Sequence, residues 1–517
     1  MNPFILSLDL EKNLQENDIA FHIYHLVESI PQEAFAPFYK ETGCPSYHPK
    51  MMLKIILCGY TQSVFSGRRI EDLTKDSIRM MWLAQGYEPS YRTINRFRVH
   101  PHMQELLRQC FVQFRCQLVE EKLIDQQAIF IDGTKIEANA NKFTFKWKKS
   151  IEKFQTNLIE KSTALYDQLV KEQVIPAIER ESAEQLNTEE LTQIATSLEK
   201  VVDDYSAKIE ASENPIERKT LRSERKSPKQ IVKQIYDWIA RKQTYEEDLR
   251  IMGERNSYSK TDRDATFMRM KDDYMQNGQL KPGFNLQIAT ENQYTLAYDV
   301  YPNPTDTKTL IPFLDHIEEQ YFELPKHIVA DAGYGSEANY ENILTKRERI
   351  PLITYGTYRK EQQKKFQQDP FQTSNWYYDE AEDTYTCPNG KKLTFEYDST
   401  RRDHAGFERQ FKVYQCEDCT NCPVRVLCTK AVEGIHRKMV VNLKWAQQKT
   451  YVQQKLSELE TAVIYRQRKI DVEPVFGFLK ANLGFTRFSV CGKAKVRNEI
   501  GLALMATNLR KYRIRGV

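Results

Sequence analysis

The segment Ala128-Ile129-Phe130-Ile131-Asp132-Gly133 decides the expected fold, because four apolar residues are followed at once by a carboxylate and a glycine. Such a run is typical of a short buried strand that ends in a turn. A second run, His327-Ile328-Val329-Ala330, ends in the same way, with Asp331 and Gly333. A single strand-end Asp is more often a cap or turn residue. Two of them predict an α/β fold with a ligand site at the ends of these strands.

Length and composition exclude several classes of protein. A chain of 517 residues is too long for one compact core, so we expect at least two domains, or one domain with large insertions. Hydrophobic residues make up 40% and charged residues 28%, which argues against wholesale disorder. The apolar stretch Met51–Cys58 is short and contains Lys54, so no membrane span is expected. Residues 1–4 show no secretory leader, and we expect a cytoplasmic protein.

The first 122 residues are predicted to be helical. Met51, Met52, Ile55, Ile56 and Tyr60 recur at helical spacing. A helix over residues 91–98 is expected to begin after Ser90 as its cap, with Ile94 and Phe97 packed inward. The residues expected to face outward and contact DNA are Arg92, Asn95, Arg96 and Arg98. A helix-turn-helix fits this pattern, and so does an ordinary helical bundle with a charged face.

The stretch 134–252 contains no glycine and is rich in Glu, Lys and Gln. Its apolar side chains at steps of 4, 3, 4 and 4 are Ile194, Leu198, Val201, Tyr205 and Ile209. They mark one face of a helix. Pro176, Pro215 and Pro228 are expected to divide the stretch into several long helices. Strand patterns return at 284–289 and 296–300, as a hairpin, and a helix is predicted over Thr309–Tyr321.

These patterns predict a chain with an interrupted core. The predicted domains are a helical N-terminal domain at 1–122, a catalytic core at 123–145 and 255–358, a helical insertion at 146–254, a cysteine-bearing β-rich insertion at 359–443, and a helical C-terminal part with a basic tail at 444–517. From Thr461 to Val517 the chain has twelve Lys or Arg and three Asp or Glu, a local net charge of +9. A basic end favours a polyanion partner, although a solvated helical face is an equally simple interpretation.

A third acid, Glu473, lies in Val472-Glu473-Pro474-Val475-Phe476-Gly477. Lys480 follows seven residues later, on the same face of a predicted helix, whereas Asp471 would face away. Three carboxylates from separate parts of a fold are what a two-metal phosphodiester site needs. Their oxygen atoms suit Mg²⁺.

These motifs together resemble the DDE transposases of bacterial insertion sequences. The shared segments are Phe130–Ala138, Val329–Tyr334 and Val472–Gly477. The likeness is strongest to the family numbered eleven-eighty-two, related to the groups numbered four and five, and it covers nearly the whole chain.

The resemblance implies an RNase H-like catalytic domain with Asp132, Asp331 and Glu473 as catalytic acids that bind two Mg²⁺ or Mn²⁺ ions. It implies binding to terminal inverted repeats and to target DNA, by a homodimer or higher oligomer, and association with the nucleoid. Related families carry a tyrosine, arginine, glutamate and lysine signature, and Tyr465 resembles its first member. Arg468 lies one residue too far from Glu473, and Lys469 occupies the expected place. The DNA contacts implied here are Arg468, Lys469, Lys480 and Arg487.

Five of the ten cysteines fall between residues 387 and 428. Clustered cysteines in a cytoplasmic chain favour a metal site. The predicted ligands of a structural Zn²⁺ are Cys387, Cys419, Cys422 and Cys428, with Cys416 as the alternative to Cys387. An iron–sulfur cluster and reduced thiols without metal are the competing interpretations.

Three functions fit the sequence. The first is a metal-dependent transposase that cuts and joins DNA. The second is a DNA-binding regulator without catalysis, and the third is a free-standing nuclease of the same fold. Cleavage and joining of end-containing DNA would separate the three.

Overall fold

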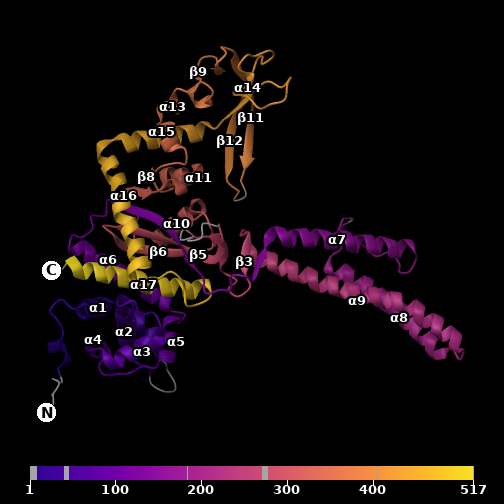
Figure 1. Ribbon diagram of the computed structural model, residues 1–517, viewed down its shortest axis with the longest axis horizontal. Coiled ribbons are helices and arrows are strands. Elements are labelled where there is room, and N and C mark those ends of the chain that lie inside the picture. Colours follow the sequence, from indigo (N-terminus) through magenta and orange to yellow (C-terminus); the bar gives the residue numbers. More distant parts are fainter. Residues whose placement is uncertain (1–8, 40–45, 183, 271–277, 404–405, 516–517) are drawn as a thin grey trace. The chain divides into compact units, whose positions relative to one another are not determined.

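The computed structural model of the chain describes residues 9–39, 46–182, 184–270, 278–403 and 406–515 (Figure 1). The chain divides into two compact units. The first comprises Met1–Ile136 and Asn285–Val517, and the second comprises Glu137–Phe284. Residues 1–4, considered above for a leader, lie outside the described part. In the ranges given, no helix has the length and apolar character to cross a membrane.

The first unit is built around a mixed sheet in which β5, β1, β7 and β8 lie in this order and β6 pairs with β5. The strands are β1 (Ala128–Glu137), β5 (Leu280–Glu291, in this unit from Asn285), β6 (Tyr294–Tyr301), β7 (His327–Ala330) and β8 (Ile350–Ile353). Strand β7 lies parallel to both β1 and β8. Strands β5 and β6 are antiparallel to each other. The strands predicted from apolar runs are therefore confirmed.

The hairpin between β5 and β6 closes through a two-residue turn. Asn292 and Gln293 both have positive φ, 50° and 61°, and Glu291 pairs with Tyr294 across the turn. Two left-handed residues give a turn whose twist matches the right-handed twist of the strands. The hairpin predicted from the strand patterns at 284–289 and 296–300 is confirmed, and the geometry of its turn fixes the register.

A hydrophobic core lies against this sheet. Ile129 and Ile131 of β1 cluster with Phe313 and Leu314 of α10 (Leu310–Gln320) and with Val452 of α15 (Leu443–Ser457). These side chains are fully or almost fully buried. Short elements connect the larger ones: η3 (Asp306–Lys308), η4 (Ala332–Tyr334), α11 (Glu337–Glu341), a π-helical turn (Asn342–Lys346), α12 (Tyr358–Glu361) and α13 (Lys364–Gln367).

The N-terminal part of the first unit is helical, as predicted. Its helices are α1 (Ile19–Ser29), α2 (Pro49–Thr61), α3 (Gly67–Asp76), α4 (Ile78–Leu83), α5 (Tyr91–Arg98) and α6 (Met103–Glu120), with 3₁₀ turns at Leu10–Asn13 and Gln32–Phe38. All of α2 except Lys50 is buried. This is the helix that the apolar spacing of residues 51–60 predicted.

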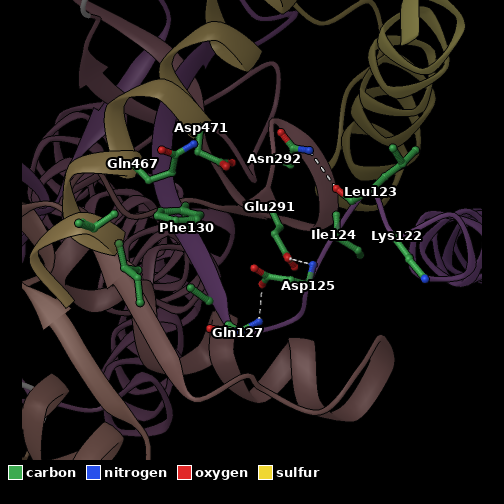
Figure 2. A pocket seen from close by; sticks show the side chains of 13 residues that line it. Lys122, Leu123, Ile124, Asp125, Gln127, Phe130, Glu291, Asn292, Gln467 and Asp471 are labelled. Carbon is green, nitrogen blue, oxygen red and sulfur yellow. Dashed lines mark hydrogen bonds between the residues drawn. The ribbon is translucent and has the colours of Figure 1, made fainter. Parts of the chain in front are cut away.

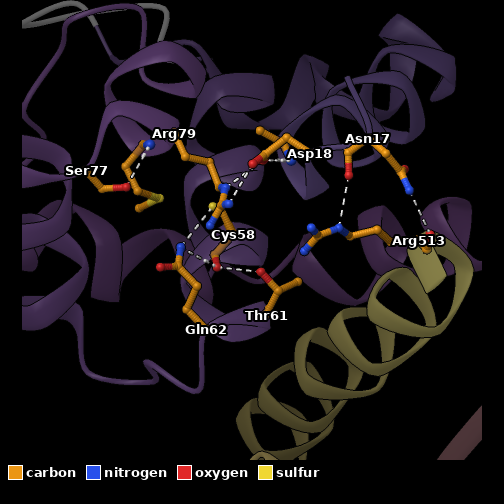
Figure 3. A network of polar contacts seen from close by, with 10 residues as sticks. Asn17, Asp18, Cys58, Thr61, Gln62, Ser77, Arg79 and Arg513 are labelled. Carbon is orange, nitrogen blue, oxygen red and sulfur yellow. Dashed lines mark hydrogen bonds and ion pairs between the residues drawn. The ribbon is translucent and has the colours of Figure 1, made fainter. Parts of the chain in front are cut away.

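An ion pair between Asp18 and Arg79 ties α1 to α4 (Figure 3). Arg79 donates to both carboxylate oxygens at 2.6 Å, and the same carboxylate accepts the Ala20 amide at the start of α1. Burial tends to raise the pKa of Asp18, but the hydrogen bonds from Arg79 and Ala20 outweigh it and lower the pKa. Asp18 is buried and Arg79 is half-buried, and the pair is bidentate, so both charges are satisfied within the fold.

The C-terminal helix α17 (Lys493–Arg515) is part of the core rather than a basic tail. Its residues from Ile500 to Leu509 are all buried, and it packs against α2, α6 and β6. Its cations serve contacts within the chain: Arg497 pairs with Asp299, Arg513 donates to Asn17 O, and Lys511 donates to Asn292 O. The middle of α17 is therefore core rather than a basic tail, because a stretch of helix that is apolar on most sides is buried, whereas Lys495 and Arg515 near its ends are exposed.

The cysteine-bearing segment forms a separate antiparallel sheet, as predicted. Its order is β13-β12-β11-β10-β9, with β9 (Tyr377–Asp379), β10 (Thr384–Thr386), β11 (Lys392–Arg402), β12 (Glu408–Cys416) and β13 (Lys438–Val441). A short helix, α14 (Arg425–Cys428), follows β12. The chain then returns through α15 to α16 (Leu459–Gly477) and a π-helical turn (Phe478–Asn482).

The second unit is dominated by three helices, α7 (Lys148–Lys171), α8 (Thr188–Ala211) and α9 (Pro215–Met252), with β2 (Phe145–Trp147), β3 (Ser257–Ser259) and β4 (Thr266–Arg269) at their base. Ile194 and Leu198 of the predicted apolar face are buried between the helices. Pro228 was expected to end a helix but lies inside α9. A proline there costs about 3 kcal/mol, and the packing of α9 along α8 and α7 offsets it.

Candidate active site

The pairing of β1 with β7 brings the two predicted strand-end aspartates together. Ile131 pairs with Ala330 in parallel register, so Asp132 and Asp331 are the next residues on two neighbouring strands. Parallel neighbours lie about 4.8 Å apart. The prediction that β1 ends at Asp132 is wrong, since the strand continues to Glu137. Asp331 does follow the last residue of β7.

Backbone amides fix one oxygen of each carboxylate. The Gly133 amide donates to Asp132 Oδ1 at 2.7 Å, and the Gly333 amide donates to Asp331 Oδ1 at 2.8 Å. Asp331 thereby caps the short turn η4, so the cap interpretation also holds for it. Asp132 is buried, with 9% of its surface exposed, and Asp331 is half-buried. Both side chains are therefore held in defined orientations.

Helix α16 passes beside this edge of the sheet. Arg468 Nη1 lies 4.0 Å from Asp132 Oδ2, and Tyr465 Oη lies 3.1 Å from Thr354 Oγ1, just after β8. Arg468, predicted to contact DNA, thus stands next to the candidate acid with 13% of its side chain exposed. Lys469, the next residue, is exposed.

Asp471 and Glu473 of α16 lie in different surroundings. Asp471 is 1% exposed and accepts the Gln293 amide at 3.0 Å, which agrees with the prediction that it faces away from the site. Glu473 is exposed. Lys480 lies in the π-helical turn Phe478–Asn482 that follows α16, and it is half-buried.

Sequence reasoning missed Asp306. A Cβ atom built at Gly133 would lie 2.7 Å from Asp306 Oδ1, and one at Gly333 would lie 3.8 Å from Asp306 Oδ2. Burial, and then the charges of Asp306, Asp132 and Asp331, raise the pKa of Tyr334 well above its usual value. Asp306 is therefore a neighbour of both candidate acids. Its sequence context, Asn303-Pro304-Thr305-Asp306, is that of an ordinary turn and offers no distinct signal.

A second group of acids lies around a pocket near the start of β1 (Figure 2). Glu291 accepts the amides of Asp125 and Gln126 at 2.5 and 2.8 Å. Burial raises the pKa of Glu291 to about 7, and burial also raises that of Asp471, which lines the same pocket. These carboxylates serve the backbone of the turns around them.

Helix α5 presents only part of its predicted DNA-binding face. Arg92 and Arg96 are exposed. Arg98 is buried, contrary to the prediction, and donates to Tyr60 Oη, Phe65 O and Asn95 Oδ1. The Asn95 carboxamide is thus engaged within the domain, where it also lies against Gly67. The eight-residue helix is packed on α3 and α2, which explains why one of its cations turns inward.

The predicted cap of α5 is also corrected. Ser90 occupies the cap position, but its side chain accepts no amide of the helix. The Tyr91 amide instead donates to Glu71 Oε2 of α3 at 2.8 Å. A distant carboxylate therefore takes the place of the local cap.

All five clustered cysteines line one cavity, but they are not arranged as metal ligands. The cavity is lined by Cys387, Cys416, Cys419, Cys422 and Cys428. Within the described ranges, no three or more His, Cys, Asp or Glu side chains are grouped so as to hold a metal ion. The predicted zinc site is thus not supported. Cys416 and Cys419 pack with Trp376 and Leu393, and burial raises the pKa of Cys416 to about 12.

The same finding applies to Asp132, Asp331 and Glu473. The two aspartates lie at one sheet edge and offer the oxygen ligands that Mg²⁺ prefers. Glu473 does not complete a three-acid group with them among the residues that are described. The donor set therefore fits a pair of divalent ions only in part.

Two family models match the chain. The one described as Transposase DDE domain matches residues 386–513, and the one described as Transposase domain (DUF772) matches residues 8–100. The matches indicate a DDE transposase. A transposase of this kind is an enzyme that cuts and joins DNA, so DNA is its substrate. No curated protein and no solved structure matches this chain.

Proposed function

We propose that the chain binds the terminal inverted repeats of its own insertion sequence and catalyses DNA strand cleavage and strand transfer. The candidate catalytic acids are Asp132, Asp331 and Glu473. The observation that carries the proposal is the parallel pairing of Ile131 with Ala330, which sets Asp132 and Asp331 side by side. Residues 386–513, which match the DDE domain, include Glu473 and α16 but neither aspartate.

We propose further that the central domain is RNase H-like. An antiparallel hairpin on one side of β1 and parallel strands on the other, in the order β6-β5-β1-β7-β8, support this fold. The helical unit follows β1 in sequence, and the cysteine-bearing sheet lies between β8 and α15. Both would then be insertions into the catalytic domain.

The reaction has two steps. Water attacks the phosphodiester at the element end, and the bond to the 3′ oxygen breaks, which frees a 3′-hydroxyl. This hydroxyl then attacks a target phosphodiester, so that one P–O bond forms, one breaks, and a target 3′-hydroxyl leaves. Divalent ions, Mg²⁺ or Mn²⁺, would supply activation of the attacking oxygen and charge stabilisation.

The chain's own residues would orient these reactants. The amides of Gly133 and Gly333 hold Asp132 and Asp331 in fixed orientations. Arg468 brings a positive charge to the edge where the scissile phosphate would lie. Fixed charges in place before the reaction are an effective source of rate enhancement.

DNA binding is proposed for the exposed cations. These are Arg92 and Arg96 of α5, Lys469 of α16 and Arg487. Their contacts would be mainly to phosphates, which carry affinity rather than sequence preference. Arg98 and Asn95 are left out, because both are engaged within the N-terminal helices. We propose a homodimer or higher oligomer on DNA, because two ends must be held together.

The test is incubation of the full chain with a labelled duplex that carries the ends of its DNA element, with and without Mg²⁺. We expect cleaved and joined products with Mg²⁺ only, and neither product from the Asp132→Ala variant. Binding without cleavage would instead support a regulator, and cleavage without joining would support a nuclease. Full cleavage by Asp132→Ala would overturn the site.

A further inference from the structure

Asp306 accepts hydrogen bonds from the side-chain carboxamides of two buried residues of β5. Asn285 Nδ2 donates to Asp306 Oδ1 at 2.7 Å, and Gln287 Nε2 donates to the same oxygen at 3.0 Å. Asn285 and Gln287 are two residues apart, so they lie on one face of the strand. They are 1% and 0% exposed. Asp306 Oδ1 is thus held in place by two side chains of one strand.

The second link runs from Gln287 to the turn that bears Asp331. Tyr334 Oη donates to Gln287 Oε1 at 2.5 Å, and Tyr334 is completely buried. The side-chain carboxamide of Gln287 therefore donates through Nε2 to Asp306 and accepts through Oε1 from Tyr334. In a buried network of this kind, each group holds the next in a single orientation.

A third link joins the neighbouring backbone. Thr307 Oγ1 donates to Gly333 O at 2.7 Å. Asn339 Nδ2 donates both to Thr307 O at 3.0 Å and to Tyr334 O at 2.7 Å. The side chains of Thr307 and Asn339 thus connect the loop at 306–307 with the turn at 331–334.

The same hydrogen-bond network also lies against β1, next to Asp132. A Cβ atom at Gly133 would lie 2.3 Å from Gln287 Nε2 and 2.7 Å from Asp306 Oδ1. Because both atoms are held by hydrogen bonds, they cannot simply rotate away. The glycine after Asp132 lets the network lie directly against β1. One set of side chains therefore controls the surroundings of Asp132 and of Asp331.

We propose that Asp306 is a positioning residue for DNA cleavage, which fixes the Asp331 turn against β1 so that Asp132 and Asp331 face one point. This inference rests on the proposed function. Reacting groups displaced by about 1 Å can lose about 100-fold in rate, so a residue that sets this alignment affects the rate without touching DNA.

The test measures single-turnover cleavage and DNA affinity of the full chain on the same end duplex. Asp306→Ala should lower the cleavage rate about 100-fold and leave the dissociation constant within about twofold of the wild type. Asp306→Asn keeps an oxygen acceptor for Asn285 and Gln287, so it should recover most of the rate. Glu319→Ala, at an exposed acid of α10, is the matched control and should be unchanged.

Three outcomes would overturn the inference. They are an unchanged cleavage rate in Asp306→Ala, an equal loss of DNA affinity, and an Asn variant as slow as the Ala variant. If Asp306→Ala does not fold, Tyr334→Phe decides, because it removes only the hydroxyl that donates to Gln287. A wild-type chain that does not cleave the duplex refutes the proposed function, whereas a cleaving wild type with an equally fast Tyr334→Phe refutes this inference.

Discussion

Two groups of acids lie near β1, one near its start and one further along the strand. The two groups differ in their surroundings. Near the start of the strand, Glu291 and Asp471 are buried and accept backbone amides of adjacent turns. Further along, Asp132 and Asp331 lie side by side on paired strands, with Arg468 and Asp306 close by. The first group stabilises turns, whereas the second converges on one edge. Burial of an acid alone therefore does not mark a site, and convergence from several elements is the better criterion.

The largest expected effect is on the cleavage rate, and it should appear when one charge is removed from the group of Asp132 and Asp331 but not from the group of Glu291 and Asp471. Asp331→Asn keeps the acceptor for the Gly333 amide but lacks the charge, and we expect cleavage to fall by about 1000-fold or more. Asp471→Asn should cleave within about threefold of the wild type, since Asp471 serves the hairpin turn. Single-turnover cleavage measures both. Equal losses in the two variants would erase the distinction between the groups.

The next effect concerns stability. Asp471→Ala leaves the half-buried Gln293 amide without its acceptor, and we expect a loss of about 1–2 kcal/mol in the free energy of unfolding. Denaturant unfolding measures it, and the exposed Glu319→Ala is the control. The remaining folded protein should cleave normally. An unchanged stability would show that the contact contributes nothing.

A pH dependence should distinguish the buried group further. The folded-state pKa of Glu291 is about 7 and thus raised, so the folded chain binds more protons than the unfolded chain between about pH 4.5 and 7. The stabilising effect of protonation is present at low pH and is lost as the pH rises through 7. Glu291→Gln should therefore be more stable than the wild type by about 3 kcal/mol at pH 8 and by less than about 1 kcal/mol at pH 5. Parallel curves would contradict the shift.

The smallest effect concerns the turn that Asp471 supports. Gln293 has a φ of 61°, which glycine adopts without strain, but its Oε1 accepts Lys511 Nζ at 3.2 Å. The relieved strain and the lost hydrogen bond should nearly offset each other, so Gln293→Gly should change the free energy of unfolding by less than about 0.5 kcal/mol. Asn292→Gly should not stabilise it, because it loses the hydrogen bond to Leu123 O. Thermal unfolding of both variants measures this. A lower melting temperature for Gln293→Gly would mean that its side chain matters more than its φ.

Much of the fold could be predicted from short segments. The apolar runs at 128–131 and 327–330 identified β1 and β7, and the helical spacing at 51–60 identified α2. In each case the signal is a local period of hydrophobicity, which neighbouring residues determine. Asp132 and Asp331 have similar local contexts, and this similarity predicts that they share one site.

Other features depended on partners far away in sequence. Arg98 turns inward because Tyr60 and Phe65 accept its hydrogen bonds, and α5 lacks its local cap because Glu71 replaces it. The basic residues of α17 bind to loops several hundred residues away, such as Asn17. No spacing within a helix reveals such partners.

The amino-acid sequence by itself determined where strands and helices form, because burial of one face imposes a period on nearby residues. It also determined that two strands carry aspartates at corresponding points. Only the tertiary structure decided which acids meet and that Asp306 joins them. It does not support the zinc site predicted for the clustered cysteines, because the described residues include no group arranged to hold a metal ion. The reason is that these relations depend on hydrogen bonds and packing between segments that folding brings together across long stretches of chain.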